Sequence, residues 1–208
     1  MPVVTAIREQ VHSKRRSVFL DEEYAFSVTL EELLEYRIAV GMCLSEEQIA
    51  AMVEAVEVRR AKMYLVQLLG YRARSESELR SRLQQKQFSE SSIDKAVESL
   101  RRMGLINDQE FAQAWVRNRL TTGKAGRLRL AQELRARGVD RQVAEGALAE
   151  MSEEKELSFA LEVGQRRYER LRDEEPEAQR RKLASFLQRR GFSYETVSRV
   201  LNRILSPD

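Results

Sequence analysis

The chain has 208 residues, of which 42% are hydrophobic and 33% charged, a balance typical of a charge-rich helical protein with a core of its own. No apolar run approaches the roughly 20 residues that span a bilayer, and the first ten residues lack the apolar segment of a signal peptide. The single cysteine, Cys43, excludes an internal disulfide. We therefore expect a cytoplasmic protein without membrane association.

The net charge of +3 hides an uneven distribution. Residues 1–56 hold five basic and ten acidic side chains, a net of −5, which leaves 31 basic and 23 acidic side chains, a net of +8, in residues 57–208. Residues 101–139 alone hold nine basic and three acidic side chains. This cationic middle indicates a polyanion or an acidic protein surface as partner. The alternative is a set of solvated helix faces.

The first part of the chain shows the alternation of β-strands. Apolar residues stand at every second position on both sides of the polar residues 21–23, with Val18 and Leu20 before them and Tyr24, Phe26 and Val28 after them. This pattern predicts a hairpin across a tight turn, with residues 3–11 as a third strand.

Two helix starts follow the predicted hairpin. Thr29 with Glu32 has the form of a capping box, and Ser45 followed by two glutamates is a second start signal. From there the apolar residues follow a period of 3.6 as far as Gly70, and the rest of the chain is predicted to be helical. Pro176 stands where the first turn of a helix tolerates proline.

One short helical pattern occurs three times. Its first copy has apolar residues at Leu79, Leu83, Phe88, Ile93, Val97 and Leu100. Adding 104 to each number gives Leu183, Leu187, Phe192, Val197, Leu201 and Ile204. A looser middle copy has Leu130, Leu134, Val139, Val143 and Ala147. Just before the apolar residue of the turn, Gly138 and Gly191 predict left-handed helix ends, where the first copy has Gln87.

A longer helix precedes each copy, over residues 57–69, 108–120 and 153–171. The repeating unit is therefore three helices in about fifty residues, and neighbouring units complete each other's cores. We predict a mostly α protein in which three tandem three-helix repeats form an elongated curved rod after a small N-terminal region with a β-hairpin. The predicted divisions are residues 1–56, 57–104, 105–151 and 152–208.

The sequence offers no constellation for catalysis. His12 is the only histidine and Cys43 the only cysteine, so neither has the partners that a zinc site or a catalytic triad requires. The segment TTGKAG lacks the earlier glycine of a phosphate-binding loop, because Asn118 stands at that position. Acidic clusters at helix starts complement the helix dipole without any metal. We therefore expect no enzyme activity, no metal and no cofactor.

Trp115 lies four residues after Phe111 on an apolar stripe, which favours a place in the core over a role as a partner anchor. Arg119 continues the same stripe by one more turn. Its side chain either extends from the edge of the core into solvent or reaches a partner, and the sequence leaves both readings open.

The sequence motifs resemble those of the RecX family, bacterial regulators of the RecA recombinase. The resemblance rests on YRARSESEL at 71–79, LRRMGLINDQEFAQAWVRNRL at 100–120, GRL at 126–128, EL at 133–134 and RGV at 137–139. Two positions depart from the family pattern: Asn107 replaces a usual aspartate, and Ala125 stands where proline is common.

The resemblance implies three tandem three-helix units and a non-enzymatic, monomeric regulator of RecA in DNA repair, homologous recombination and the SOS response. It implies binding to RecA filaments on DNA, with altered ATP hydrolysis, strand exchange and filament growth. The basic residues of the connectors are our candidates for partner contacts, since arginine holds carboxylates and phosphates in fixed geometry. They are Arg72, Arg74, Arg117, Lys124, Arg127 and Arg129.

The sequence is compatible with two alternative functions. Three-helix units also occur in helix-turn-helix DNA-binding proteins, but the segments DKAVESL and RQVAEGALAE are not rich in the side chains that read base edges. Contact with the DNA phosphate backbone remains compatible with the sequence. The other alternative is a helical adaptor for a different protein partner.

Overall fold

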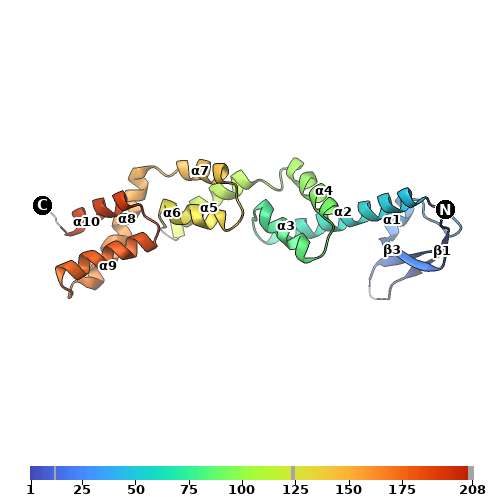
Figure 1. Cartoon of the computed structure of the whole chain (residues 1–208), viewed down its shortest axis with the longest axis horizontal. Helices are drawn as coiled ribbons and strands as arrows, with labels where there is room; N and C mark the ends of the chain where they lie inside the picture. The colour runs from blue at the N-terminus through green and yellow to red at the C-terminus, as the bar shows by residue number, and fades with distance from the viewer. Residues whose placement is uncertain (12, 123–124, 206–208) are drawn as a thin grey trace. The chain divides into compact units, whose positions relative to one another are not determined.

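The computed structural model describes residues 1–11, 13–122 and 125–205. The chain divides into two compact units. The first unit consists of Met1–Arg72 and Arg80–Leu105, and the second of Ala73–Leu79 and Ile106–Asp208. Figure 1 labels the strands and helices of both units.

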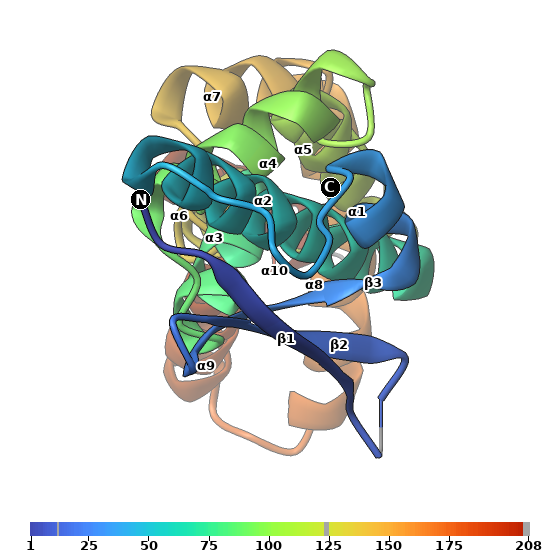
Figure 2. The ribbon, with the colours of Figure 1, turned by 90° about the vertical axis from the view of Figure 1, so that its right-hand side faces the viewer.

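The first unit begins with a three-stranded antiparallel sheet in the order β1-β2-β3, formed by β1 (Val4–Glu9), β2 (Arg15–Leu20) and β3 (Glu23–Thr29). Figure 2 shows the three strands side by side. Asp21 and Glu22 form the two-residue loop between β2 and β3, both with positive φ, at +47° and +73°. This is the turn geometry that matches the twist of a hairpin. The predicted hairpin and its third strand are confirmed.

Two capped helices follow the sheet, α1 (Leu30–Glu35) and α2 (Glu46–Tyr71). The predicted capping box of Thr29 with Glu32 is present, and Ser45 caps α2. The helix expected over residues 57–69 is the second half of α2, because no glycine or proline interrupts residues 46–69. The predicted division between residues 56 and 57 therefore does not coincide with a helix boundary.

A helical hairpin, α3 (Glu76–Gln85) and α4 (Glu90–Arg102), follows α2. Glu57 of α2 holds the start of α4. Its carboxylate accepts hydrogen bonds from the Ser89 N–H at 3.0 Å, the Ser89 hydroxyl at 2.6 Å and the Ser92 hydroxyl at 2.8 Å. The α3–α4 turn is thus attached to α2 by one side chain.

The second unit contains two further three-helix repeats. The helices of the second repeat are α5 (Asp108–Thr122), α6 (Arg127–Arg135) and α7 (Arg141–Ala149). Those of the third are α8 (Glu153–Tyr168), α9 (Pro176–Arg189) and α10 (Tyr194–Leu205), with a short 3₁₀ turn, η1 (Glu169–Leu171), after α8. Pro176 occupies the first turn of α9 as predicted.

The turn inside each repeat has the same backbone geometry. Gln87, Gly138 and Gly191 have φ of +61°, +70° and +82°. In each copy the next residue donates its N–H to a carbonyl five residues earlier, from Phe88 to Leu83, from Val139 to Leu134 and from Phe192 to Leu187. This hydrogen bond defines a Schellman helix end. The left-handed ends predicted at the two glycines are confirmed.

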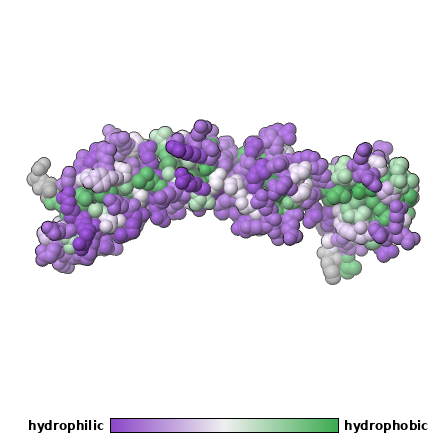
Figure 3. Space-filling view, viewed as in Figure 1, coloured by the Kyte–Doolittle hydropathy of each residue, from purple (hydrophilic) through white to green (hydrophobic). Residues whose placement is uncertain are grey.

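The shared apolar positions form the cores of the repeats. All are buried except Phe88 and Val143, which are half-buried. Hydrophilic side chains dominate the visible surface of the helical repeats, whereas hydrophobic ones gather over the N-terminal sheet (Figure 3). The fold is mostly α, with three three-helix repeats after a small sheet, as the periodicity predicted.

Candidate anion-binding pocket in the second unit

The start of α6 lies directly against the C-terminal end of α9. The N–H of Gly126 donates to the Arg190 carbonyl at 2.9 Å, and the N–H of Leu128 donates to the Gly191 carbonyl at 3.1 Å. A Cβ on Gly126 would lie within 3.0 Å of the Gly191 backbone, and a Cβ on Gly191 would collide equally with Arg129. Both glycines are therefore needed for this backbone contact, which we call the Gly126–Gly191 joint.

Glu133 of α6 arranges the side chains beside this joint. Its carboxylate accepts a hydrogen bond from the Trp115 indole N–H at 3.0 Å and another from the Arg119 Nε at 2.9 Å. Arg129 lies one helical turn earlier, with its Nε 3.4 Å from the other carboxylate oxygen. The Glu133 side chain is only 15% exposed, so it holds the two arginines from the buried side.

A pocket of about 380 Å³ opens between these side chains and α9. We call it the arginine pocket; its lining residues are Arg119, Ala125, Arg129, Glu133, Phe186, Arg189 and Arg190. Four arginines against one glutamate give a net charge of +3. The arginine side chains at positions 119 and 129 keep 39% and 53% of their surface exposed. The pocket therefore suits a carboxylate or a phosphate, both of which match the guanidinium fork.

Of the predicted contact residues, Arg129 lies in the arginine pocket and Arg127 lies outside its lining. Arg127 begins α6, and its backbone N–H donates to the buried Glu156 at 2.9 Å. Its guanidinium donates to the Met151 carbonyl and lies 3.8 Å from the same Glu156 carboxylate. These contacts connect the second repeat to the third, so Arg127 has a structural role.

The other predicted residues are dispersed. Arg117 is exposed on α5, Arg72 caps the end of α2 in the first unit, and Arg74 precedes α3. Lys124 lies outside the described residues. The arginine pocket therefore contains one of the six predicted positions.

Three residues of the pocket are not predicted from the sequence: Phe186, Arg189 and Arg190. The repeat itself contains a signal for one of them. The residue before the left-handed turn position is basic in every copy, at Lys86, Arg137 and Arg190. No local signal indicates that α9 lies against the start of α6, because the joint brings together residues more than sixty positions apart.

Trp115 forms part of the core, as the sequence favoured. Its ring stacks on Phe111 with centroids 6.1 Å apart and belongs to the apolar cluster of the second repeat. Arg119 and Arg137 both lie over the ring, with the Arg137 guanidinium 3.7 Å from its centroid. Arg119 thus covers the edge of the core and at the same time faces the pocket.

Within the described residues, no group of histidine, cysteine, aspartate and glutamate side chains is arranged to hold a metal ion. None of the helices described is both long and apolar enough to cross a bilayer.

Fold and site together define a tandem three-helix-repeat protein with a basic pocket between two repeats. Family models match four successive parts of the chain. They are the RecX N-terminal domain at residues 2–45 and the first, second and third RecX three-helix domains at residues 61–100, 107–148 and 154–201. The chain belongs to the RecX family of regulatory proteins.

Individual relatives agree over the whole length. A regulatory protein RecX of Bacillus pumilus is 33% identical over 204 residues, which cover 97% of this chain and 77% of that protein. One of Clostridioides difficile is 26% identical, with 100% of this chain and 98% of the relative covered. A crystal structure of a regulatory protein RecX superposes with a TM-score of 0.74 at 26% identity, covering 96% of this chain and 98% of that one.

Proposed function

We propose that this chain is a cytoplasmic, monomeric regulator that binds RecA filaments on DNA and inhibits their ATP hydrolysis, strand exchange and growth, without catalysing a reaction itself. Membership of a regulatory family supports the general role. The observation that carries the proposal is the arginine pocket, whose lining contains four arginines and a single carboxylate. A filament of protein and DNA presents carboxylates and phosphates, the two groups that such a pocket binds.

The repeats suit a partner that is itself repetitive. Several weak contacts along one chain reinforce each other, because the first contact raises the effective concentration of the next. Charged contacts of this kind weaken as salt screens them over a Debye length of about 8–10 Å. Inhibition is therefore expected to decline between low and high ionic strength.

The first test measures ATP hydrolysis by the cognate RecA on single-stranded DNA while this protein is added below one molecule per RecA. Turnover is expected to fall at these substoichiometric ratios, because one bound regulator affects protomers beyond those it contacts. Unchanged turnover at low salt, even with the protein in excess, would reject the proposal. The remaining function would then be that of a helical adaptor for a different protein partner.

A charge reversal at Arg189 tests the arginine pocket itself. Arg189 lines the pocket from an exposed position on α9, so Arg189→Glu removes two units of positive charge from the pocket while leaving the core intact. We expect filament affinity to fall about five- to tenfold, as for other charged contacts at an interface. The measurement is the midpoint of the ATPase titration.

Arg180→Glu is the matched control. Arg180 is exposed on the same helix, nine residues earlier, and therefore about 180° around the helix axis. Equal losses for both variants would show that only net charge matters. Binding of each variant to free single-stranded DNA separates the two ligands, since a loss seen equally without RecA assigns the pocket to phosphate.

A further inference from the structure

A second pocket, of about 440 Å³, lies entirely within the first unit. We call it the N-terminal pocket. Strand and α1 residues on one side of it face α2 and the α3–α4 turn on the other. Its lining residues are Arg15, Thr29, Glu31, Glu32, Arg59, Arg60, Met63, Tyr64, Lys86 and Phe88. It is independent of the arginine pocket, because the two share no residue.

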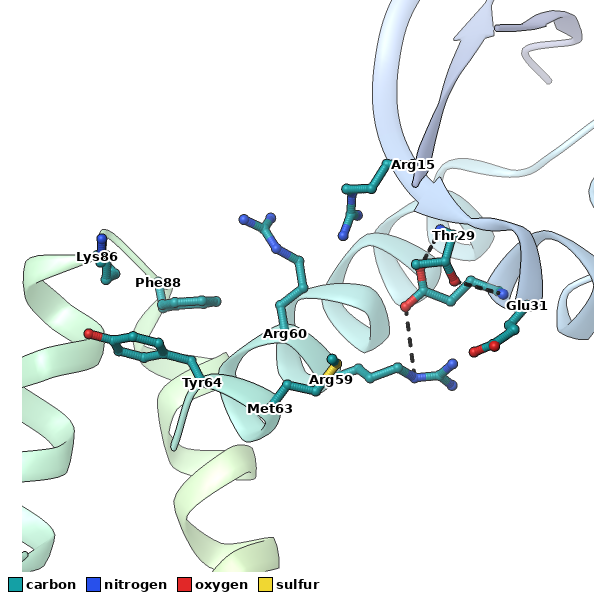
Figure 4. A pocket seen from close by; sticks show the side chains of 10 residues that line it. Arg15, Thr29, Glu31, Arg59, Arg60, Met63, Tyr64, Lys86 and Phe88 are labelled. Carbon is teal, nitrogen blue, oxygen red and sulfur yellow. Dashed lines mark hydrogen bonds and ion pairs between the residues drawn. The ribbon is translucent and has the colours of Figure 1, made fainter. Parts of the chain in front are cut away.

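Two like charges converge in this pocket. Figure 4 shows Arg15 extending from the sheet and Arg60 from α2 into the same space. Burial lowers the pKa of Arg15 and the nearby charge of Arg60 lowers it further, against a smaller opposing effect of the Glu32 carboxylate. The only hydrogen bond described for the Arg15 side chain goes to the neutral carbonyl of Ser27. Two guanidinium groups held together in this way favour an anion between them.

The cations of the pocket differ in how far the chain itself neutralises them. Arg59 lies 2.6 Å from a Glu35 carboxylate oxygen and 3.8 Å from Glu32. By contrast, within the part of the chain that the structure describes, neither the Arg60 guanidinium nor the Lys86 ammonium forms an ion pair. The charge of Arg60 acts on Glu57 one turn earlier, and its guanidinium lies 5.8 Å from the centroid of the Phe88 ring. Positive charge therefore remains available at the mouth of the pocket.

The floor of the pocket is apolar and aromatic. Figure 4 places the rings of Tyr64 and Phe88 beside each other, on the other side of Arg60 from the sheet, and Met63 on α2 is 69% exposed. Phe88 departs from its repeat equivalents. Phe192 and Val139, at the same turn position, are 2% and 6% exposed, whereas Phe88 is half-buried and faces the pocket. The first repeat thus leaves partly exposed, as an aromatic ring, the apolar turn residue that the other two repeats bury.

We propose that the N-terminal pocket binds an acidic peptide segment of a protein partner, in which a carboxylate side chain neighbours an apolar one. The carboxylate lies between Arg15 and Arg60, and the apolar side chain packs on Tyr64 and Phe88. Such a segment matches both the cations and the half-buried aromatic floor, whereas a simple anion matches only the cations.

Charge favours a peptide over a nucleic acid. Residues 1–56, which supply one wall of the pocket, carry a net charge of −5, and Glu31 stands exposed in the lining. Nucleic-acid grooves instead present continuous positive charge along the phosphate backbone. A short acidic segment needs only the few cations that are present here.

The proposal is tested on the full chain with a fluorescein-labelled peptide of about ten residues, rich in aspartate and glycine and containing one phenylalanine. Fluorescence anisotropy is expected to show saturable binding. Changing the aspartates to asparagine, or the phenylalanine to serine, is expected to weaken binding at least about fivefold in each case. Full binding by either altered peptide, or no binding by the parent peptide at low salt, would overturn the proposal.

Arg60→Glu locates the site. Arg60 is exposed on α2, so we expect the fold to persist, which circular dichroism checks, and peptide affinity to fall about tenfold. Lys62→Glu is the matched control, two residues along the same helix and about 200° around its axis. Equal affinity of the Arg60 variant and the wild type would refute the site. So would stronger, Arg60-dependent binding of an oligothymidine of similar length, which would assign the pocket to nucleic acid.

Discussion

The α3–α4 turn of the first unit and the α9–α10 turn of the second have one backbone geometry but different surroundings. Both contain a left-handed residue and the same hydrogen bond back to the preceding helix, from Phe88 in one and from Phe192 in the other. The α9–α10 turn is covered by the start of α6 through the Gly126–Gly191 joint. The α3–α4 turn is attached to α2 through Glu57, and its aromatic residue stays open to the N-terminal pocket.

This difference shows how copies of a repeat acquire separate surroundings without changing their local fold. Where the turn residue is glycine, another segment approaches closely, the backbone at the start of α6 at Gly191 and the Ser77 side chain at Gly138. Where the turn residue is Gln87, an exposed side chain occupies the same position. Three substitutions test this comparison, and the largest effect is expected at the joint.

Gly191→Ala is expected to destabilise the second unit by about 3 kcal/mol. The new Cβ would collide with Arg129, and alanine is strained at a φ of +82°. Urea unfolding followed by the fluorescence of Trp115, the single tryptophan of the chain, measures this loss.

Two glycine-to-alanine controls separate the causes. Gly126→Ala has no positive φ to strain and reports the steric clash alone. Gly146→Ala lies in α7 with open space around its Cβ, so it is expected to stabilise the protein by about 0.5–1 kcal/mol. If Gly191→Ala unfolds at the same urea concentration as Gly146→Ala, the joint does not form in solution.

Glu57→Gln weakens the attachment of the α3–α4 turn to α2 and is expected to lower the free energy of unfolding by about 1 kcal/mol at neutral pH. The value is modest because Glu57 is only half-buried. Burial raises the pKa of Glu57, but hydrogen bonds from Ser89 and Ser92 and the charge of Arg60 lower it more, so the pKa falls below its usual value of 4.5. A carboxylate with a lowered pKa stabilises the fold above its unfolded pKa, and this contribution disappears as the pH falls through the folded pKa.

The difference in melting temperature between wild type and Glu57→Gln should therefore be constant near neutral pH and shrink below about pH 4. Circular dichroism across this range measures it. The control is Glu47→Gln, at an exposed position on the same helix. It is expected to lower the free energy of unfolding by less than about 0.5 kcal/mol. A gap that widens on acidification would mean that the charge of Glu57 does not hold the turn.

The sequence predicted the parts of this architecture that depend on local chemistry. Hydrophobic alternation located the hairpin, and Ser45 marked the start of α2. The repeat identified the core positions and the left-handed turns at Gly138 and Gly191. Each of these features depends on the backbone preferences or on the apolar spacing of a few neighbouring residues.

The pockets could not be predicted in the same way. The sequence indicates the basic connector between α5 and α6, yet the arginine pocket is completed by Arg189 and Arg190 at the C-terminal end of α9, which only the joint brings near. Arg127, predicted as a contact residue by its charge, also contacts Glu156 at the junction of the second and third repeats. Long-range packing thus decides which charges remain available, and short-range patterns do not contain that information.

Gln87→Gly carries the smallest expected effect and tests whether the first turn tolerates the residue of the other two. Glycine removes the conformational strain of a residue with a side chain in the left-handed region, about 1–2 kcal/mol. It also raises the entropic free-energy cost of folding, by about 0.5–1 kcal/mol. We therefore expect a gain of about 0.5 kcal/mol, with peptide binding at the N-terminal pocket unchanged because Gln87 is not in its lining. Thermal melting measures the gain. Gln84→Gly inside α3 should instead destabilise by about 1 kcal/mol; destabilisation by both variants would mean that Gln87 makes a contact of its own at the turn.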